Sequence, residues 1–390
     1  MEKVRIKDGY GNPVNVLTSV DCVLDANLPI VKPEDFTGAS IAEKVIAANN
    51  FIVESNGGYE LRFEDTSEYL ITQAIVLPSN TVVRIKGCTI RMTDNTVDNM
   101  FRTSNITPDS EHPVGHATNK SNMPTCKNIS ILGEGATLVM ENNASQSGEL
   151  TVGWRGNVIC FAGVDGFDIS GLTINKNLCW AVNIARCKNG KVHDIVFNTT
   201  RGNGDGVDVM GEHIDVYNIS GSTQDDTTVV YNVNTARYTA RPAEVNVPIV
   251  PFDYGYDFGY GHDSHDIHFH NVHTTGTNHI LILITGTYEI YNVTASNLSD
   301  KDSTSQKSAI VKIYGGQYNG DFNMNLIHNC CINDIYGHNC SKGTIWFSQG
   351  VIKDGRFNLV KTPSGKTAVS NESGVTLADY DCIITNQVTV

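Results

Sequence analysis

The sequence predicts an all-β fold, a single-stranded right-handed parallel β-helix with a short α-helix capping its N-terminal end. An apolar pair spaced three residues apart recurs from about residue 126 onward, and helical signals are scarce elsewhere. A period near 21–24 residues, with strands joined by Asn and Gly turns, implies a solenoid in which each coil adds one rung to parallel sheets. A large sandwich with regular strand spacing is the alternative, but it does not require the same apolar phase at every turn. The pairs, whose first members lie 23, 24, 53, 21 and 42 residues apart, are Ile169/Leu172, Val192/Ile195, Val216/Ile219, Phe269/Val272, Ile290/Val293 and Ile332/Ile335.

A capping-box pattern at Ser40 and Glu43 predicts the start of the helix, which we expect over residues 40–50. This helix would cover the first strands, whose edge otherwise exposes unpaired backbone groups. Its apolar face is formed by Ile41, Val45 and Ala48.

Two regions are expected along the chain. Residues 1–35 are predicted as an N-terminal attachment segment, and residues 36–390 as the β-helix, of about ten coils. The 53-residue step equals one coil plus an insertion, which we place at about 233–262. The 42-residue step is read as two coils of 21. The C-terminal strand signals GRFNLV and DCIITNQVTV should continue or cap the last coils.

Composition limits the partners. The net charge of −14 excludes nucleic acid, because no basic stripe is present to neutralise phosphates. No run approaches the ~18 apolar residues that span a bilayer, and MEKVRIKDGYGNPVNV lacks the apolar region of a signal peptide. The ten cysteines form no CxxC pair, which favours reduced thiols over the alternatives of disulfides or a metal site.

Two acidic motifs stand out, Asn203-Gly-Asp205-Gly206 and Gln224-Asp225-Asp226. Asp205 and Asp226 are 21 residues apart, so on a β-solenoid they sit on neighbouring rungs about 4.8 Å apart. Taken alone, such Asp pairs are usually turn residues. Their spacing of one coil instead favours a shared site, in which like charges raise the pKa of at least one carboxyl group.

The stretch NGDGVDVMGEHIDVYNISGSTQDD resembles the core of glycoside hydrolase family 28, the polygalacturonases and their relatives. Their pattern is NTDG, about twenty residues, then QDD or GDD, on a pectin-lyase-like β-helix; here Gly replaces the Thr. The resemblance implies inverting hydrolysis, with Asp225 as general acid and with Asp205 and Asp226 holding and activating water. Inverting enzymes separate these carboxyl groups by ~6.5–9.5 Å to admit that water. Asn203, which opens the motif, is then expected to contact substrate.

The family next has a His one coil further on. Gly261-His262 is a tempting match, but removal of the insertion leaves His279 about one coil after Asp226, so His279 is favoured as the fourth catalytic residue.

The family then carries an RIK triplet 33–35 residues beyond the His. Lys312 and Tyr314 lie 33 and 35 residues past His279, so Lys replaces the Arg and Tyr replaces the Lys. In polygalacturonases these basic residues are expected to hold a substrate carboxylate. Lys cannot bind a carboxylate through two parallel hydrogen bonds as Arg does, and Tyr lacks the positive charge of Lys. These replacements point to a neutral or differently decorated glycan.

Two further segments carry candidate binding residues. Six aromatic residues lie in the predicted insertion; they form either a wall of the substrate groove, with Tyr254 and Tyr256 as the binding candidates, or the loop's own small core. The segment GHDSHDIHFHNVH is rich in His, but Ile267 and Phe269 alternate with polar residues, as on an outward strand face. A zinc site needs three or four converging ligands, so we expect neither a metal nor a cofactor. The aromatic residues are Tyr238, Phe252, Tyr254, Tyr256, Phe258 and Tyr260.

These features together predict a hydrolase of a bacterial surface or extracellular polysaccharide. A capped β-helix with an N-terminal segment and no signal peptide resembles a bacteriophage tail-spike or tail-fibre depolymerase. This resemblance implies a homotrimer on the virion, or otherwise an extracellular protein, that contacts phage tail or baseplate proteins. A non-catalytic glycan-binding receptor-recognition protein on the same scaffold is the alternative. A polysaccharide lyase would need Ca²⁺ or a basic cluster beside the carboxylates, which the sequence does not show.

Overall fold

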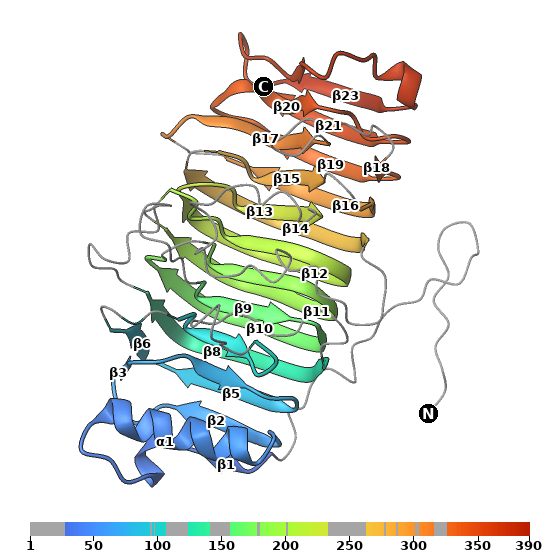
Figure 1. The fold of residues 1–390 in the computed structure, drawn as a ribbon. Helices are drawn as coiled ribbons and strands as arrows, with labels where there is room; N and C mark the ends of the chain where they lie inside the picture. Colours follow the sequence, from blue (N-terminus) through green and yellow to red (C-terminus); the bar gives the residue numbers. More distant parts are fainter. Residues whose placement is uncertain are drawn as a thin grey trace, which may run out of the picture.

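The structure is a computed structural model that describes residues 28–93, 96, 98–106, 124–140, 157–177, 180–199, 202–232, 263–276, 278–285, 288–300, 304–315 and 326–390. Strands of successive coils lie one above another in an elongated stack, with the helix at one end and the C-terminus at the other (Figure 1). The described strands pair in parallel from coil to coil. The predicted parallel β-helix is confirmed.

The elements in chain order are β1 Ile30–Val31, α1 Ile41–Glu54, β2 Tyr59–Phe63, β3 Glu68–Ile71, β4 Ile75–Leu77, β5 Thr81–Lys86, β6 Thr89–Met92, β7 Phe101–Thr103, β8 Cys126–Val139, β9 Ile159–Ala162, β10 Val164–Asn175, β11 Val182–Asn198, β12 Val207–Thr223, β13 Thr228–Asn232, β14 Ser264–Gly276, β15 Leu281–Thr285, β16 Ile290–Ser299, β17 Lys307–Tyr314, β18 Ile327–His328, β19 Cys331–Tyr336, β20 Cys340–Gln349, β21 Arg356–Thr362, β22 Val369–Asn371 and β23 Ile383–Thr389.

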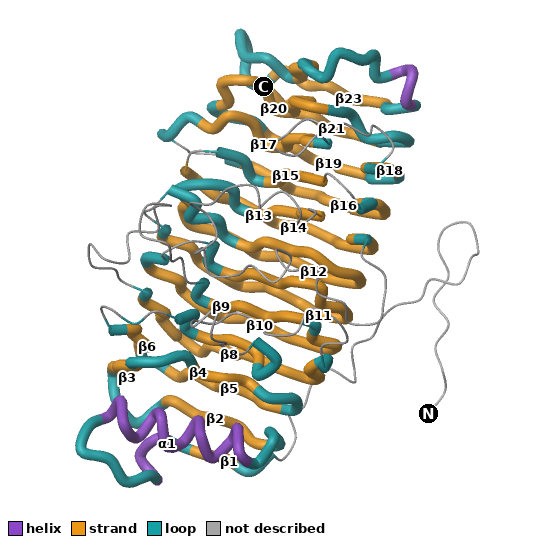
Figure 2. Tube along the Cα trace, in the orientation of Figure 1, coloured by secondary structure: helices purple, strands orange, loops and turns teal. Residues whose placement is uncertain are grey.

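The helix α1 covers the first coil (Figure 2). The Ser40 hydroxyl caps it by accepting a hydrogen bond from the Glu43 backbone, 3.3 Å away. The helix runs to Glu54, four residues past the predicted end, because Ile52 continues its buried face beyond Ala48. A capping helix was therefore predicted correctly, but its length was not.

The N-terminal boundary can be followed from residue 28. Ile30 and Val31 pair with Glu60 and Leu61 of β2, so this part of the expected attachment segment belongs to the first coil. The rest of the expected attachment segment, residues 1–27, lies outside the described residues. The predicted insertion at 233–262 also lies outside them, yet β12 and β14 on either side pair directly.

One ladder of strands runs along the face that carries the acidic motifs. Over the described residues it passes through ten levels, in line with the coils expected: β4, β7, β9, the first parts of β11 and β12, then β13, β15, β17, β20 and β22.

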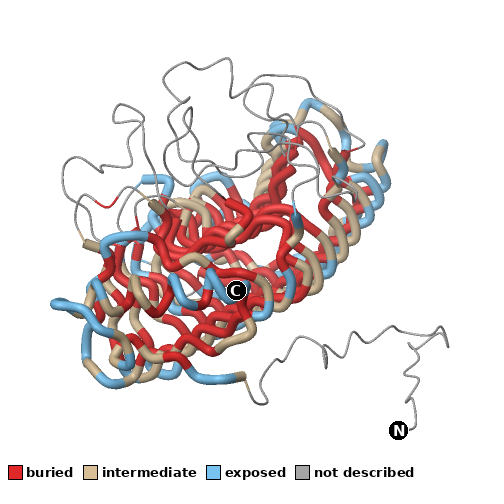
Figure 3. Tube along the Cα trace, turned by 60° about the horizontal axis from the view of Figure 1, so that its bottom comes forward, coloured by how far each residue is buried: buried red, intermediate tan, exposed pale blue. Residues whose placement is uncertain are grey.

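The apolar pairs stack in the core as predicted up to β14. Ile169 pairs with Val192, Val192 with Val216, and Val216 with Phe269. Buried segments follow one another along the interior in Figure 3, and these side chains belong to one continuous core. Burying such side chains is the main favourable contribution to folding.

The next step was assigned wrongly. Phe269 pairs with Ala295 and not with Ile290, and Ala295 pairs with Ile332, so the coil steps are 26 and 37 residues and not 21 and 42. The strand β16 carries two apolar pairs spaced by three, and Ile290/Val293 lies one corner earlier in the coil, opposite Ser264 and Ile267.

The turns between sheets carry a ladder of amides. The Asn218 amide donates to Asp194, Asn271 to Asn218, and Asn297 to Asn271, at 2.8–3.1 Å. Each of these residues has a φ of +53° to +56°, a conformation that Asn and Asp tolerate better than other side chains. This is the physical basis of the Asn-rich repeat.

Candidate functional site

The acidic motifs lie in the turns that lead into neighbouring strands. Asp205 precedes β12, Asp225 and Asp226 precede β13, and His279 precedes β15. Their backbones are joined from rung to rung, because the Gly206 amide donates to the Asp226 carbonyl at 2.9 Å and the Thr227 amide to the His279 carbonyl at 2.8 Å. Residues up to 74 positions apart therefore meet at one place.

Asp226 and His279 form a tight pair. The His279 Nδ1 lies 2.6 Å from the Asp226 Oδ1, which also accepts the His279 backbone N–H at 3.2 Å. The His279 side chain is 5% exposed, and the centre of its ring lies 5.9 Å from that of Trp346. Two hydrogen bonds from one residue fix the orientation of the Asp226 carboxylate. His262, the other match considered, lies outside the described residues.

Asp225 is in a different environment. Burial raises the pKa of its carboxyl group above the ordinary value, and the charge of Asp226 raises it further. Three interactions partly oppose this shift: a hydrogen bond from the Asn278 side-chain amide, the charge interaction with His279 and a hydrogen bond from the Asn203 backbone. A carboxyl group with a raised pKa beside a hydrogen-bonded carboxylate is the arrangement that general acid–base catalysis needs.

A fourth carboxyl group, that of Asp208, was missed in the sequence analysis. Its side chain is fully buried on β12, and its pKa is raised well above the ordinary value, by burial and then by the charges of Asp226 and Asp225, with Asp205 opposing. Val207 and Val209 on either side point into the core. The alternation of Val, Asp and Val was the signal, since it places Asp208 on the outward face with the acidic motifs.

A buried lysine lies behind this cluster. Lys307 is 0% exposed, and its Nζ is 3.5 Å from the Thr275 carbonyl. Burial lowers its pKa from 10.5 to about 8, an effect that the charges of Asp300 and Asp226 partly offset.

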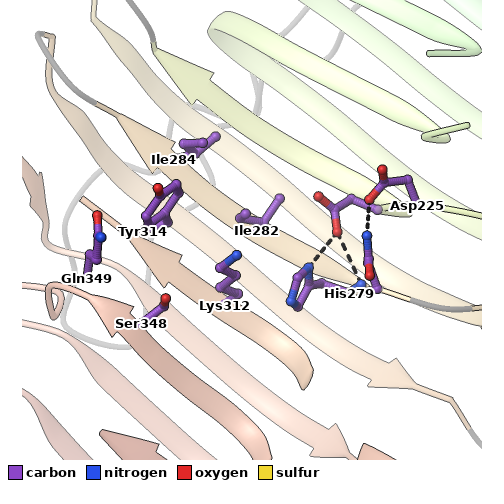
Figure 4. A pocket seen from close by; sticks show the side chains of 10 residues that line it. Asp225, His279, Ile282, Ile284, Lys312, Tyr314, Ser348 and Gln349 are labelled. Atoms are coloured by element: carbon purple, nitrogen blue, oxygen red, sulfur yellow. Dashed lines mark hydrogen bonds and ion pairs between the residues drawn. The ribbon is translucent and has the colours of Figure 1, made fainter. Parts of the chain in front are cut away.

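A pocket of about 360 Å³ opens beside Asp225, Asp226 and His279 (Figure 4), within the range of small-ligand sites. Lys312 and Tyr314 line it as well, whereas Asp205 and Asn203 do not. Tyr254 and Tyr256 lie outside the described residues. The complete lining is Asp225, Asp226, Asn278, His279, Ile282, Ile284, Lys312, Tyr314, Ser348 and Gln349.

Lys312 lies between two aromatic rings. Its Nζ is 4.7 Å from the centre of the Trp346 ring and 4.9 Å from that of Tyr314, within the range of cation–π attraction. Burial lowers the pKa of Lys312, with Asp226 and Asp225 opposing.

The His-rich strand β14 forms an outward face, as the alternation predicted. His265 pairs with Glu212 at 3.1 Å and Asp266 at 2.8 Å, and His270 stacks on Tyr217. Among the residues with described positions, no three His, Cys, Asp or Glu are arranged to hold a metal ion. The described helices include none that is long and apolar enough to cross a membrane.

The fold and site define a parallel β-helix with a cluster of carboxyl groups on one outward face. Solved structures share this architecture. A mutant tailspike protein of E. coli bacteriophage HK620 has a TM-score of 0.56 at 11% identity, over 98% of this chain and 65% of that chain. Another mutant of this tailspike, in complex with a pentasaccharide, has a TM-score of 0.55 at 13% identity, over 92% and 65% of the two chains.

An exopolygalacturonase from Thermotoga maritima is also similar, with a TM-score of 0.49 at 12% identity, over 88% of this chain and 89% of that chain. The match spans just under two thirds of the tailspike chains. No protein-family model matches the chain, and no curated protein sequence matches it. The TM-scores above 0.5 for the tailspike structures show a shared fold, and at 11–13% identity they show the fold alone.

Proposed function

We propose that this chain is a glycoside hydrolase that cuts a bacterial surface or extracellular polysaccharide by inversion. One observation supports this most: Asp225, with its raised pKa, lies beside Asp226, which is held by two hydrogen bonds from His279, at the wall of a ligand-sized pocket. The similarity of the sequence motifs to family 28 assigns the same residues.

In the proposed reaction Asp225 donates its proton to the glycosidic oxygen as the bond to the anomeric carbon breaks. A water oxygen bonds to that carbon from the opposite face, and its proton passes to Asp226, with Asp205 helping to orient the water. His279 holds Asp226 in position. Lys312 and Tyr314 contact the sugar on the other side of the pocket.

A non-catalytic glycan-binding role is the second candidate. It is favoured by the replacement of two basic family residues at Lys312 and Tyr314, and by the position of Asp205 outside the pocket lining. Such a protein would bind the same glycan without releasing reducing sugar.

The experiment is a screen of purified bacterial surface glycans for release of reducing ends, followed by the variant Asp225→Asn. The amide keeps the shape but has no proton to donate, so we expect turnover to fall by ~10²–10⁴-fold, with glycan binding and the circular dichroism spectrum retained. Asp215→Asn, on the outward face of another part of β12, is the matched control and should keep full activity.

Wild-type activity in both Asp225→Asn and Asp226→Asn would show that the catalytic groups lie elsewhere. A glycan that is bound and never cut would favour the receptor-recognition role. The anomeric form of the fresh product, read by NMR, tests inversion.

The wider role that we propose is that of a tail-spike depolymerase on a phage virion. It would act as a homotrimer attached to other tail or baseplate proteins. The shared fold with the HK620 tailspike, one structure of which holds a pentasaccharide, supports this role.

A further inference from the structure

A cluster of apolar side chains continues from the carboxylates along the same ladder of strands. We call this cluster the apolar platform. It is buried and separate from the core, and Trp180 and Tyr314 pack against it. Two of its members, Ile282 and Ile284, line the same pocket as Asp225 and His279 (Figure 4). The platform consists of Met210, Val229, Tyr231, Ile282 and Ile284.

The register places the platform beside the reacting groups. Ile282 and Ile284 follow His279 by three and five residues on β15, which at ~3.3 Å per residue sets them roughly 10 and 17 Å along the strand. Alternate residues of a strand face the same side, so both side chains point outward. Val229 and Tyr231 lie next to them in the neighbouring strand, because Val229 pairs with Ile282 and Tyr231 with Ile284.

The charges of the pocket disfavour an acidic sugar. Of the side chains that line it, Lys312 is the one Lys or Arg, and its ammonium group already lies over the rings of Trp346 and Tyr314. Asp225 and Asp226 line the same pocket. A uronate would lose hydration there without the bidentate partner that Arg provides.

We propose that this pocket selects an uncharged glycan with methyl groups, in 6-deoxy or N-acetyl sugars, which pack on Ile282 and Ile284 next to the Tyr314 ring. The inference rests on the proposed function and names its substrate class. One methyl group in an apolar pocket discriminates by roughly 10- to 200-fold, which sets the expected difference in affinity.

The test measures binding to the Asp225→Asn protein, so that no probe is consumed. Two pairs of uncharged probes, which all carry the same anomeric O-methyl group, differ at the position in question: methyl L-rhamnoside (C6 methyl) against methyl L-mannoside (C6 hydroxymethyl), and methyl N-acetylglucosaminide (acetamido) against methyl glucoside (hydroxyl). The first of each pair is called the methyl-bearing probe, for its C6 or acetyl methyl group. Trigalacturonate is the acidic probe, and saturation-transfer NMR gives the dissociation constants. We expect at least one methyl-bearing probe to bind roughly tenfold or more tightly than its partner, with saturation transfer strongest at its methyl protons, and trigalacturonate to bind least.

Replacement of Ile282 and Ile284 by Thr in the same protein should abolish the discrimination, since Thr keeps the branched shape but adds a hydroxyl group. Val196→Thr, at an exposed position of β11, is the control and should leave it unchanged. Any one of four results would overturn the proposal. The probes of each pair could bind with equal affinity, or the methyl-bearing probes could show no saturation transfer. Trigalacturonate could bind most tightly, or the discrimination could survive the double replacement. Binding can be measured without turnover, so the two proposals can fail separately. If the protein distinguishes the probes but cuts no glycan, only the proposed hydrolase activity is refuted. If the protein cuts polygalacturonate, only this inference about the substrate class is refuted.

Discussion

Substitution of the buried Lys307 by Met should change how the stability of the protein depends on pH. The folded protein lowers the pKa of this amine from 10.5 to about 8, and each pKa unit is worth 1.36 kcal/mol. The unfolded chain therefore binds more protons than the folded chain between these two values. The contribution of Lys307 to the free energy of unfolding rises with pH across that window and is complete above the unfolded pKa. Between pH 7 and pH 10 the rise is about 2–3 kcal/mol.

The assay is urea unfolding of the wild type and of Lys307→Met at several pH values from 7 to 10. Met has a similar length and no charge, and the Asp300 carboxylate remains hydrogen-bonded to the His338 and Asn339 amides. The stability difference, wild type minus variant, should rise with pH by this amount, while groups common to both proteins cancel. Lys366→Met, at an exposed position, should give a flat difference. A flat or falling difference for Lys307→Met would refute the reasoning, because it would mean that this amine is not desolvated in the folded protein.

Three further predictions concern catalysis, the turns and assembly. As the proposed general acid, Asp225 would have to be protonated, so kcat/KM should fall as pH rises through its raised pKa. The variant Asn278→Ala, which removes a hydrogen bond that lowers this pKa, should move that basic limb to higher pH; a limb that stays or moves down would contradict the assignment. Gly276→Ala should lower the melting temperature strongly, because Gly276 has a φ of +113° and a Cβ there would lie 1.8 Å from the Thr223 carbonyl oxygen. Gly202 has open space around it, so Gly202→Ala should leave the melting temperature nearly unchanged. Light scattering at micromolar concentration should give the mass of a trimer, and a monomer mass would count against the tail-spike role.

The fold could be predicted because its repeat is visible in the sequence. Each rung needs inward apolar residues at the same phase, and Ile169, Val192 and Val216 keep this phase at nearly constant spacing. The prediction lost the register at β16, where Ile290/Val293 and Ala295/Leu298 present the same pattern on one strand. Sequence spacing cannot distinguish two apolar pairs that differ only in the sheet they belong to; backbone pairing can.

The site could be predicted in part for the same reason. The spacing of one coil predicted that Asp205 and Asp226 lie on neighbouring rungs. The structure also brings Asp226 into contact with His279. Asp208 was not found, because the alternation of Val, Asp and Val gives its outward direction but does not distinguish it from an ordinary outward strand position. Its importance comes from burial and from the carboxylates of neighbouring rungs, which are properties of the stacked coils and not of its local sequence.

The β-helix itself explains why carboxyl groups on this face differ in protonation. Rungs are held about 4.8 Å apart by backbone hydrogen bonds, so Asp residues on successive rungs cannot move away from one another as surface side chains do. Burial, together with the like charges close by, raises the pKa of Asp208 and of Asp225. Hydrogen bonds from His279 on the next rung hold Asp226. Insertions between rungs leave this spacing intact, since β12 and β14 remain paired across 53 residues of chain. A site of this kind therefore depends on the register of the strands β12, β13 and β15, and it tolerates extra chain inserted between rungs.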